Sequence, residues 1–211
     1  MNKKLLILVF LFSILGLNAQ DAKSILDKAN LAYNQAGGIT ASFTINTEDV
    51  KGKTVYSQDG KAYLKGNKFK IDVPDGITWF DGKTQWVYAK GGDEVNVSNP
   101  TGEELAGVSP SVLLSLYKTG FKLNYKGEKK EKAKTVYVVE MIPLGKKTEF
   151  TKMVIHIDKA TNIFTSVNTF GKDGVNNQLI ITKLQTGVNL LDNLFVFNKK
   201  EYPQIEVIDL R

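Results

Sequence analysis

Hydrophobic and polar residues follow two different periods at the start of the chain. Over residues 21–35, apolar side chains recur every three to four positions, including Ile25, Ala29 and Ala32, as on one face of an amphipathic helix. Gly37-Gly38 supplies a stop for that helix. From there the period falls to two, which is typical of a strand with one apolar face. The apolar positions of this strand are Ile39, Ala41, Phe43 and Ile45.

Further along, short alternating segments are separated by Asp-Gly and Gly-Gly dipeptides, whose glycines supply the positive φ of hairpin turns. Gln58-Asp59-Gly60 is one predicted turn, and the charge run Gly127–Lys134 is a predicted hairpin tip. Short connections and no long β-α-β crossover favour an antiparallel sheet of about ten or eleven strands. Such a sheet must hide one apolar face, and curling it around a helix does so. The predicted strands include Thr54–Ser57, Lys61–Lys65, Ile77–Phe80, Thr84–Ala89, Glu94–Val97, Phe121–Tyr125, Thr135–Ile142, Glu149–Asp158, Ile163–Phe170, Asn176–Gln185 and Leu194–Asn198.

A helical insertion over Pro100–Thr119 interrupts the β pattern. Ser109-Pro110 has the form of an N-cap followed by proline at the first helical position. Gly120 ends the segment. One helical face carries Val112, Leu113, Leu116 and Tyr117.

The first residues have the order of a secretory signal peptide. Lys3 and Lys4 precede the apolar run Leu5–Leu17, which is shorter than the roughly 20 residues of a membrane span. We therefore expect residues 1–19 to be a signal peptide and residues 20–211 to form one domain. The expected location is the periplasm.

Composition excludes several kinds of chemistry. The 211 residues include no cysteine and one histidine, His156, so disulfides, cysteine nucleophiles, cysteine-ligated zinc and two-histidine metal motifs are absent. No Gly-x-Ser-x-Gly elbow or glycine-rich phosphate loop occurs, and we expect no catalytic residue, metal or cofactor. Gly91–Val95 resembles a nucleotide-cyclase signature but lies between two short strands, where a hairpin turn explains it better. The net charge of +6 requires no acidic partner, and basic residues do not cluster with aromatics as in nucleic-acid binders.

Aromatic residues are spread through the predicted strands, and this distribution has two interpretations. They fill an ordinary core, or they line an apolar pocket, of about 300–1,000 Å³ in typical ligand sites, inside a curled sheet closed by helices.

Four segments resemble the LolA-like family of outer-membrane lipoprotein carrier proteins, across nearly the whole chain after residue 19. The most specific is Asp81–Tyr88, which is similar to the family hairpin Ser-Asp-Gly-Lys-x-x-Trp-x-Tyr. Lys65–Ile71 is similar to the family stretch Arg-Pro-x-x-Phe-x-Trp, with Lys65 and Gly66 in place of arginine and proline. The opening and closing patterns are at Ile39–Thr44, Leu194–Phe197, Pro203 and Ile205–Asp209.

This resemblance implies a mainly β fold, an incomplete antiparallel β-barrel with an N-terminal helix and a helical lid. Its apolar face would hold the acyl chains of lipoproteins, received from an inner-membrane ABC transporter and passed to an outer-membrane acceptor that the sequence does not identify. Lys65, at the family's latch arginine, becomes the candidate lid latch, although it lacks the planar fork of arginine. The expected cavity residues are Phe43, Ile45, Phe69, Ile71 and Trp86. The expected lid residues are Leu105, Val112, Leu113 and Leu116.

The sequence therefore favours a monomeric periplasmic lipoprotein carrier without catalysis. We expect Phe69→Glu to block cargo uptake without unfolding the protein. Three alternatives stay open: a binder or sensor of another lipid, a secreted hydrolase that uses carboxylates borne on strands, and a structural β protein with a filled core.

Overall fold

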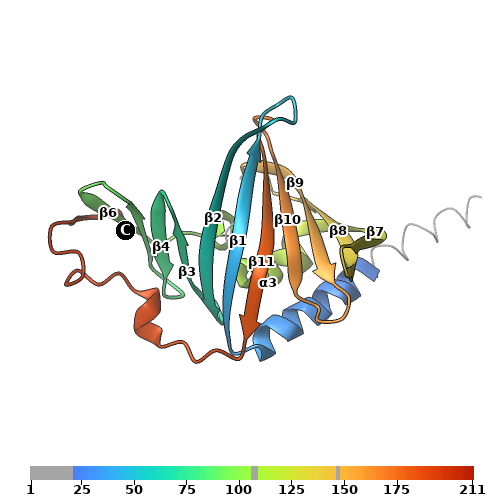
Figure 1. Cartoon of the computed structure of the whole chain (residues 1–211), viewed down its shortest axis with the longest axis horizontal. Coiled ribbons are helices and arrows are strands. Elements are labelled where there is room, and N and C mark those ends of the chain that lie inside the picture. Colours follow the sequence, from blue (N-terminus) through green and yellow to red (C-terminus); the bar gives the residue numbers. More distant parts are fainter. Residues whose placement is uncertain (1–20, 106–108, 146–147) are drawn as a thin grey trace, which may run out of the picture.

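The computed structural model describes residues 21–105, 109–145 and 148–211 (Figure 1). The expected signal peptide over residues 1–19 lies outside these ranges.

The strands of the described ranges form one open sheet (Figure 1). Their order is β12-β6-β5-β4-β3-β2-β1-β11-β10-β9-β8-β7, so β12 and β7 are the two edges. Neighbours are antiparallel, except that β12 runs parallel to β6. The unclosed antiparallel sheet is confirmed, with twelve strands instead of ten or eleven. The strands are β1 (Gly38–Glu48), β2 (Thr54–Lys65), β3 (Lys68–Val73), β4 (Gly76–Phe80), β5 (Gln85–Ala89), β6 (Glu94–Ser98), β7 (Phe121–Glu131), β8 (Lys134–Pro143), β9 (Phe150–Asp158), β10 (Phe164–Gly171), β11 (Asn176–Thr186) and β12 (Glu206–Asp209).

Helices occur where the sequence predicts them. Residues 21–35 are helical, and α2 (Gly102–Leu105) and α3 (Pro110–Gly120) separate β6 from β7. Pro110 stands at the start of α3, after Ser109 in extended conformation. Among the described residues, no helix is long and apolar enough to cross a membrane.

The predicted turn at Gln58-Asp59-Gly60 is wrong, because β2 continues through it. Gly60 lies opposite Phe43 of β1. A Cβ atom at Gly60 would come within 2.4 Å of the Phe43 ring. The glycine therefore makes room for an aromatic ring on a neighbouring strand, which a local sequence pattern does not distinguish from a turn.

Two further predictions are corrected. The charged segment Gly127–Lys134 does contain a hairpin tip, between β7 and β8, but most of it is strand, since β7 extends to Glu131 and the chain turns at Lys132, whose φ is +53°. The last predicted strand, Leu194–Asn198, is irregular, and its first residues belong to a 3-10 helix, η1 (Asp192–Phe195).

The main core lies on the face of the sheet that carries the helices. The helix at residues 21–35 contributes Leu26, Ala29 and Tyr33, and α3 contributes Leu113 and Tyr117. Figure 1 shows the N-terminal helix across the lower ends of β8–β10 and α3 behind the centre of the sheet. We call this covered side the helical face.

A second cluster lies on the opposite face of β4–β6. The segment after η1 loops around the β6 end of the sheet (at the left in Figure 1) and then adds β12 beside β6. Its Phe197 and Tyr202 contact the Trp79 ring edge-on, with centroids at 5.6 Å and 5.8 Å. We call this group the aromatic cluster: Ile77, Trp79, Trp86, Tyr88, Val95, Phe197, Tyr202 and Ile205.

Candidate ligand-binding cavity

A cavity of about 440 Å³ lies on the helical face under the N-terminal end of α3. Strands β1, β2, β9, β10 and β11 form its floor and walls. Its volume falls in the range of about 300–1,000 Å³ that is usual for ligand pockets. The apolar side chains around it include Ile45, Leu113, Met153, Phe164, Val167 and Leu179.

Strand pairing brings four of the five predicted cavity residues to the helical face. Ile45 lines the cavity itself. Phe43 lies two residues before Ile45 on β1 and therefore on the same face. Leu64 of β2 pairs with β1 on one side and with Phe69 of β3 on the other, which places Phe69 and Ile71 on this face as well. Ile71 is half-buried, whereas Phe43 and Phe69 are buried.

Phe69 belongs to the closed core. Its side chain is 0% exposed, and its ring stacks on Phe80 with centroids 5.1 Å apart. The expectation that Phe69→Glu leaves the fold intact is therefore corrected, because a carboxylate at this position would lose its water without gaining a partner.

Trp86 is not brought together with the other four. It pairs with Trp79, which pairs with Lys70, and Lys70 lies between Phe69 and Ile71 on β3. Because side chains alternate along a strand, Trp86 lies on the other face. The ring belongs to the aromatic cluster.

The predicted lid residues cover the cavity side of the sheet. Leu105, Val112 and Leu113 are buried in the main core, and Leu116 is half-buried against it. Sequence reasoning did not select Leu114, which is equally buried and extends the apolar surface of α3. The helices therefore occupy much of the surface that an apolar ligand would contact.

Lys65 does not hold this lid. Leu64 lies in the core, so the adjacent Lys65 lies on the opposite face. Its Nζ donates to Asp192 Oδ1 and to the Leu190 carbonyl, both at 2.8 Å. Lys68 Nζ contacts the other Asp192 oxygen at 2.9 Å, and the two lysines lower the pKa of Asp192 to about 2. Lys65 therefore fastens the C-terminal segment, which corrects its expected role as the lid latch.

The contact that fastens α3 joins it to the N-terminal helix. The Tyr117 hydroxyl, on a side chain only 1% exposed, donates to Asp27 Oδ1. Lys118 Nζ lies 3.5 Å from the same carboxylate, and Lys23 Nζ lies 2.9 Å from its other oxygen. Hydrogen bonds from Lys23 and Tyr117 lower the pKa of Asp27, whereas burial and the Asp27 charge raise that of Tyr117. Sequence reasoning missed this pair because 90 positions separate its members.

Two polar atoms at the cavity are buried without a hydrogen-bond partner in the described structure. They are Gln58 Oε1 and Ser109 Oγ. Ser109 is the N-cap residue of α3 and is 2% exposed, yet its hydroxyl makes no capping bond. By contrast, Thr47 and Asn177 at the same cavity are joined by a 2.7 Å hydrogen bond. Sequence reasoning selected Ser109 only as a cap and did not select Gln58 for the cavity.

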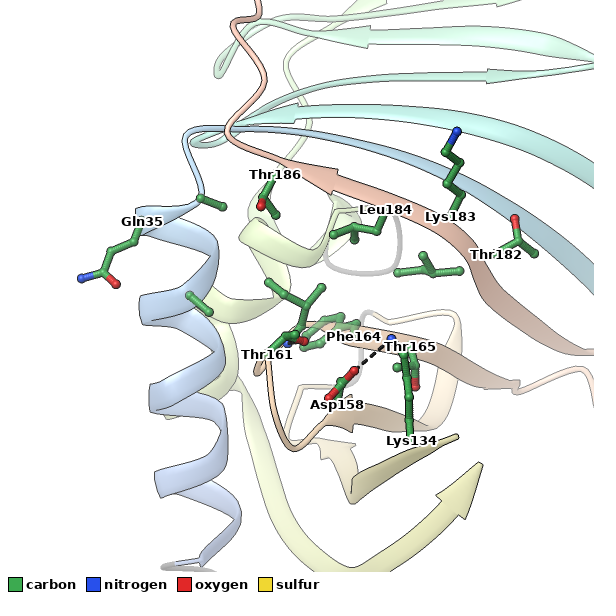
Figure 2. Close-up of a pocket in the computed structure, with 14 residues that line it drawn as sticks. Gln35, Lys134, Asp158, Thr161, Phe164, Thr165, Thr182, Lys183, Leu184 and Thr186 are labelled. Atoms are coloured by element: carbon green, nitrogen blue, oxygen red, sulfur yellow. Dashed lines mark hydrogen bonds and ion pairs between the residues drawn. The ribbon is translucent and has the colours of Figure 1, made fainter. Parts of the chain in front are cut away.

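A second cavity of about 440 Å³ adjoins the first (Figure 2). It opens between the end of the N-terminal helix and the last part of β11. There, after Ile180, β11 still pairs with β1 but no longer pairs with β10. Figure 2 shows the ion pair at its base, in which Lys134 Nζ lies 2.9 Å from Asp158. Phe164 and Ile181 line both cavities and so separate them.

Burial and hydrogen bonding have opposite effects on the pKa of Asp158. Burial acts to raise the pKa of this carboxyl, but hydrogen bonds from Lys134 and the Ala160 N–H outweigh it and hold the pKa below its ordinary value. The ion pair is therefore charged at neutral pH and gives the second cavity a polar base.

A family model described as "Outer membrane lipoprotein carrier protein LolA" matches residues 12–169. The chain belongs to this family. The match includes the helices, the cavity strands up to β10 and the hairpin with Trp86 that carried the resemblance.

One solved structure supports the fold of this LolA-family chain, and a second has a lower similarity. A conserved protein from Thermus thermophilus, uncharacterised by its description, superposes with a TM-score of 0.62 at 14% identity, over 90% of this chain and 99% of that one. A putative outer membrane lipoprotein-sorting protein domain from Vibrio parahaemolyticus gives a TM-score of 0.49 at 16% identity, over 87% and 99% of the two chains. At 14% identity, the likeness to the Thermus thermophilus protein concerns the fold alone.

A sequence relative is longer than this LolA-family chain. A protein of Methanocaldococcus jannaschii, described as uncharacterised, is 29% identical over 167 residues, which cover 75% of this chain. The aligned region spans about half of that relative, at 49% of its length.

The polar groups of the described residues do not assemble into a metal site. No group of three or more His, Asp or Glu side chains gathers closely enough there to hold an ion. His156 Nδ1 lies 2.8 Å from Glu131 Oε1, so the single histidine pairs with a carboxylate on another strand. What the arrangement offers is an apolar cavity covered by a helix that is fastened at its far end.

Proposed function

We propose that this protein is a periplasmic carrier that binds the acyl chains of lipoproteins under α3 and shuttles them from the inner to the outer membrane. It would act without catalysis and as a monomer, with an inner-membrane ABC transporter as donor and an outer-membrane acceptor. The observation that carries the proposal is the 440 Å³ cavity, which lies on the apolar face of an open sheet, under an amphipathic helix. Membership of the LolA family supports it.

The covering helix suits reversible binding. Burial of each CH₂ group stabilises an acyl chain by about 0.8 kcal/mol, so full burial of a long chain would make release slow. In this protein Leu113 of α3 already lines the cavity, and Leu105 and Val112 lie in the same core. An entering chain must displace part of this apolar surface. The net affinity is then the difference between two similar burials.

The proposal is tested by native mass spectrometry of the protein isolated from the periplasm of lipoprotein-producing cells. We expect a bound species whose mass matches an acylated polypeptide. Ile45→Trp places an indole in the cavity and should abolish this species while the protein stays folded. A bound lipid without polypeptide would indicate a binder of another lipid and contradict the lipoprotein assignment.

Gln178→Trp is the matched control. Gln178 lies between Asn177 and Leu179, which line the cavity, so its side chain lies on the opposite face of β11. This variant should retain the bound species. Equal loss in both variants, or unliganded wild-type protein, would argue against the cavity as the binding site.

A further inference from the structure

The two unpartnered polar atoms, Gln58 Oε1 and Ser109 Oγ, reach the cavity from different elements. Gln58 lies on β2 opposite Ile45, and Ser109 precedes α3. Both residues line the same 440 Å³ cavity. A buried polar atom without a partner destabilises a fold, so two at one cavity require an explanation.

Neither atom has a structural task that accounts for its burial. The Ser109 hydroxyl stands at an N-cap position but donates to no carbonyl and accepts from no amide of the described residues. The Gln58 side chain takes no part in the hydrogen bonds between neighbouring strands, unlike Thr47 and Asn177 beside it. A ligand whose polar groups face Gln58 and Ser109 inside the cavity would satisfy both atoms.

We infer that Gln58 and Ser109 form a polar subsite for the head of an acylated ligand, next to its chain. The amide oxygen of Gln58 accepts a hydrogen bond, and the Ser109 hydroxyl both donates and accepts. The ligand is therefore an amphiphile with an O–H or N–H donor close to its acyl carbonyl. This inference rests on the proposed function and adds to it a preference among acylated molecules.

Two sources of that donor exist in acylated molecules: a glycerol hydroxyl beside an ester, and the N–H of an acyl amide. Three probes with the same chain separate them. Lauroylglycerol carries hydroxyls, N-lauroylglycine methyl ester carries an amide N–H, and methyl laurate carries neither. Displacement of a fluorescent acyl probe from the purified protein measures the affinity of each.

We expect the wild-type protein to bind at least one donor-bearing probe about threefold to tenfold more tightly than methyl laurate, the range of one hydrogen bond. Gln58→Leu and Ser109→Ala should each lose that advantage and leave the affinity for methyl laurate unchanged. The tighter of the two donor-bearing probes identifies the source.

Matched controls are Gln178→Leu, on the opposite face of the sheet, and Ser115→Ala. Ser115 is exposed on α3, and its hydroxyl already donates to the Val112 carbonyl at 2.7 Å. Both controls should keep the preference of the wild type.

The Tm of the unliganded variants distinguishes a role in ligand binding from a role in stabilising the fold. Removal of an unpartnered hydroxyl or amide should leave Tm unchanged or raised, whereas loss of a working N-cap would lower it. A lower Tm for Ser109→Ala, or equal affinity of the wild type for all three probes, would overturn the subsite. If no acyl probe binds the wild type, the proposed function fails together with it.

Discussion

The two faces of the sheet use apolar residues in different ways. Over β4–β6 the aromatic cluster is filled by rings in contact, as where Tyr202 lies 5.5 Å from Tyr88 and 5.3 Å from Phe197 between centroids. On the helical face, about 440 Å³ is left unfilled between aliphatic side chains, Met153 and Phe164, with polar side chains such as Gln58 also at its wall. Trp79 and Tyr202 of the aromatic cluster also border a cavity of about 330 Å³, whose other lining residues include Lys70, Asn193 and Glu201. The side chains around the cavity under α3 differ, because flexible aliphatic chains under a separate helix can move apart for an apolar guest. This difference is consistent with the proposed binding of acyl chains on the helical face.

The coverings of the two faces are fastened by similar means. Each depends on one aspartate. Asp27 accepts a hydrogen bond from Tyr117 of α3, and Asp192 forms ion pairs with Lys65 and Lys68. They differ in burial, since Tyr117 lies in the core and Asp192 is exposed. Changes to the rings, to the cavity and to the two fasteners should therefore have separable effects.

The largest effect is expected from Trp79→Ala in the aromatic cluster. Loss of this buried ring should lower the free energy of unfolding by about 3–5 kcal/mol, measured in urea. Acyl binding by the folded fraction should be unchanged, because the ring lies on the opposite face of the sheet from the cavity under α3. Loss of binding in folded protein would show that the two faces are coupled.

Leu113→Ala should destabilise the protein less, by about 2–4 kcal/mol, because part of its surroundings is already empty. The variant should bind acyl probes more tightly, since it enlarges the cavity and weakens the competing helix. Leu114→Ala is the control: this leucine is as buried on α3 but does not line the cavity. Weaker acyl binding by Leu113→Ala would contradict competition between helix and ligand.

Tyr117→Phe should cost about 1 kcal/mol of stability, because it removes one hydrogen bond and keeps the ring. Hydrogen exchange should become faster in α3, and Tyr125→Phe, whose hydroxyl makes no hydrogen bond in the described structure, should change little. The lowered pKa of Asp27 means that its contribution is present above the ordinary carboxyl pKa of 3.8 and is lost as the pH falls through the folded value. The difference between wild type and variant should therefore shrink below about pH 4. A difference that grows on acidification would exclude Asp27 as the partner.

The smallest effect is expected from Asp192→Asn, because the group is exposed and its ion pairs are screened by water. Hydrogen exchange should become faster around η1 and stay unchanged in α3, and Lys65→Gln should have the same pattern. Since the pKa of Asp192 is lowered to about 2, its contribution in the wild type should disappear as the pH falls from about 4 to about 2. Faster exchange in α3 after Lys65→Gln would restore Lys65 as the lid latch.

Local patterns in the sequence predicted the elements well. The period of Ile25 and Ala29 identified the N-terminal helix, and Ser109-Pro110 marked the start of α3. Errors arose where a residue serves a distant neighbour, as Gly60 does for Phe43. Pairings such as Asp27 with Tyr117 have no local signal, because chain folding alone brings them together.

A local pattern also does not determine on which face of the sheet a side chain lies. Alternation orders residues within one strand, but turn length decides how strands are aligned. The two-residue turn at Gly66-Asn67, with φ of +59° at the glycine, places Leu64 opposite Phe69. Lys65 consequently lies opposite Lys68, away from the helices. The same reasoning, carried across β4 and β5, assigns Trp86 to the aromatic cluster.

Short-range periods and motifs were enough to predict the antiparallel sheet, the two helical regions and the family. The packing of distant elements sets which apolar residues surround a void, which fill a core and which charged groups fasten each covering. Local patterns do not show this, because a cavity is the volume that side chains from distant strands fail to fill. Gln58 and Ser109 border that volume only after β2 and α3 have met across the helical face.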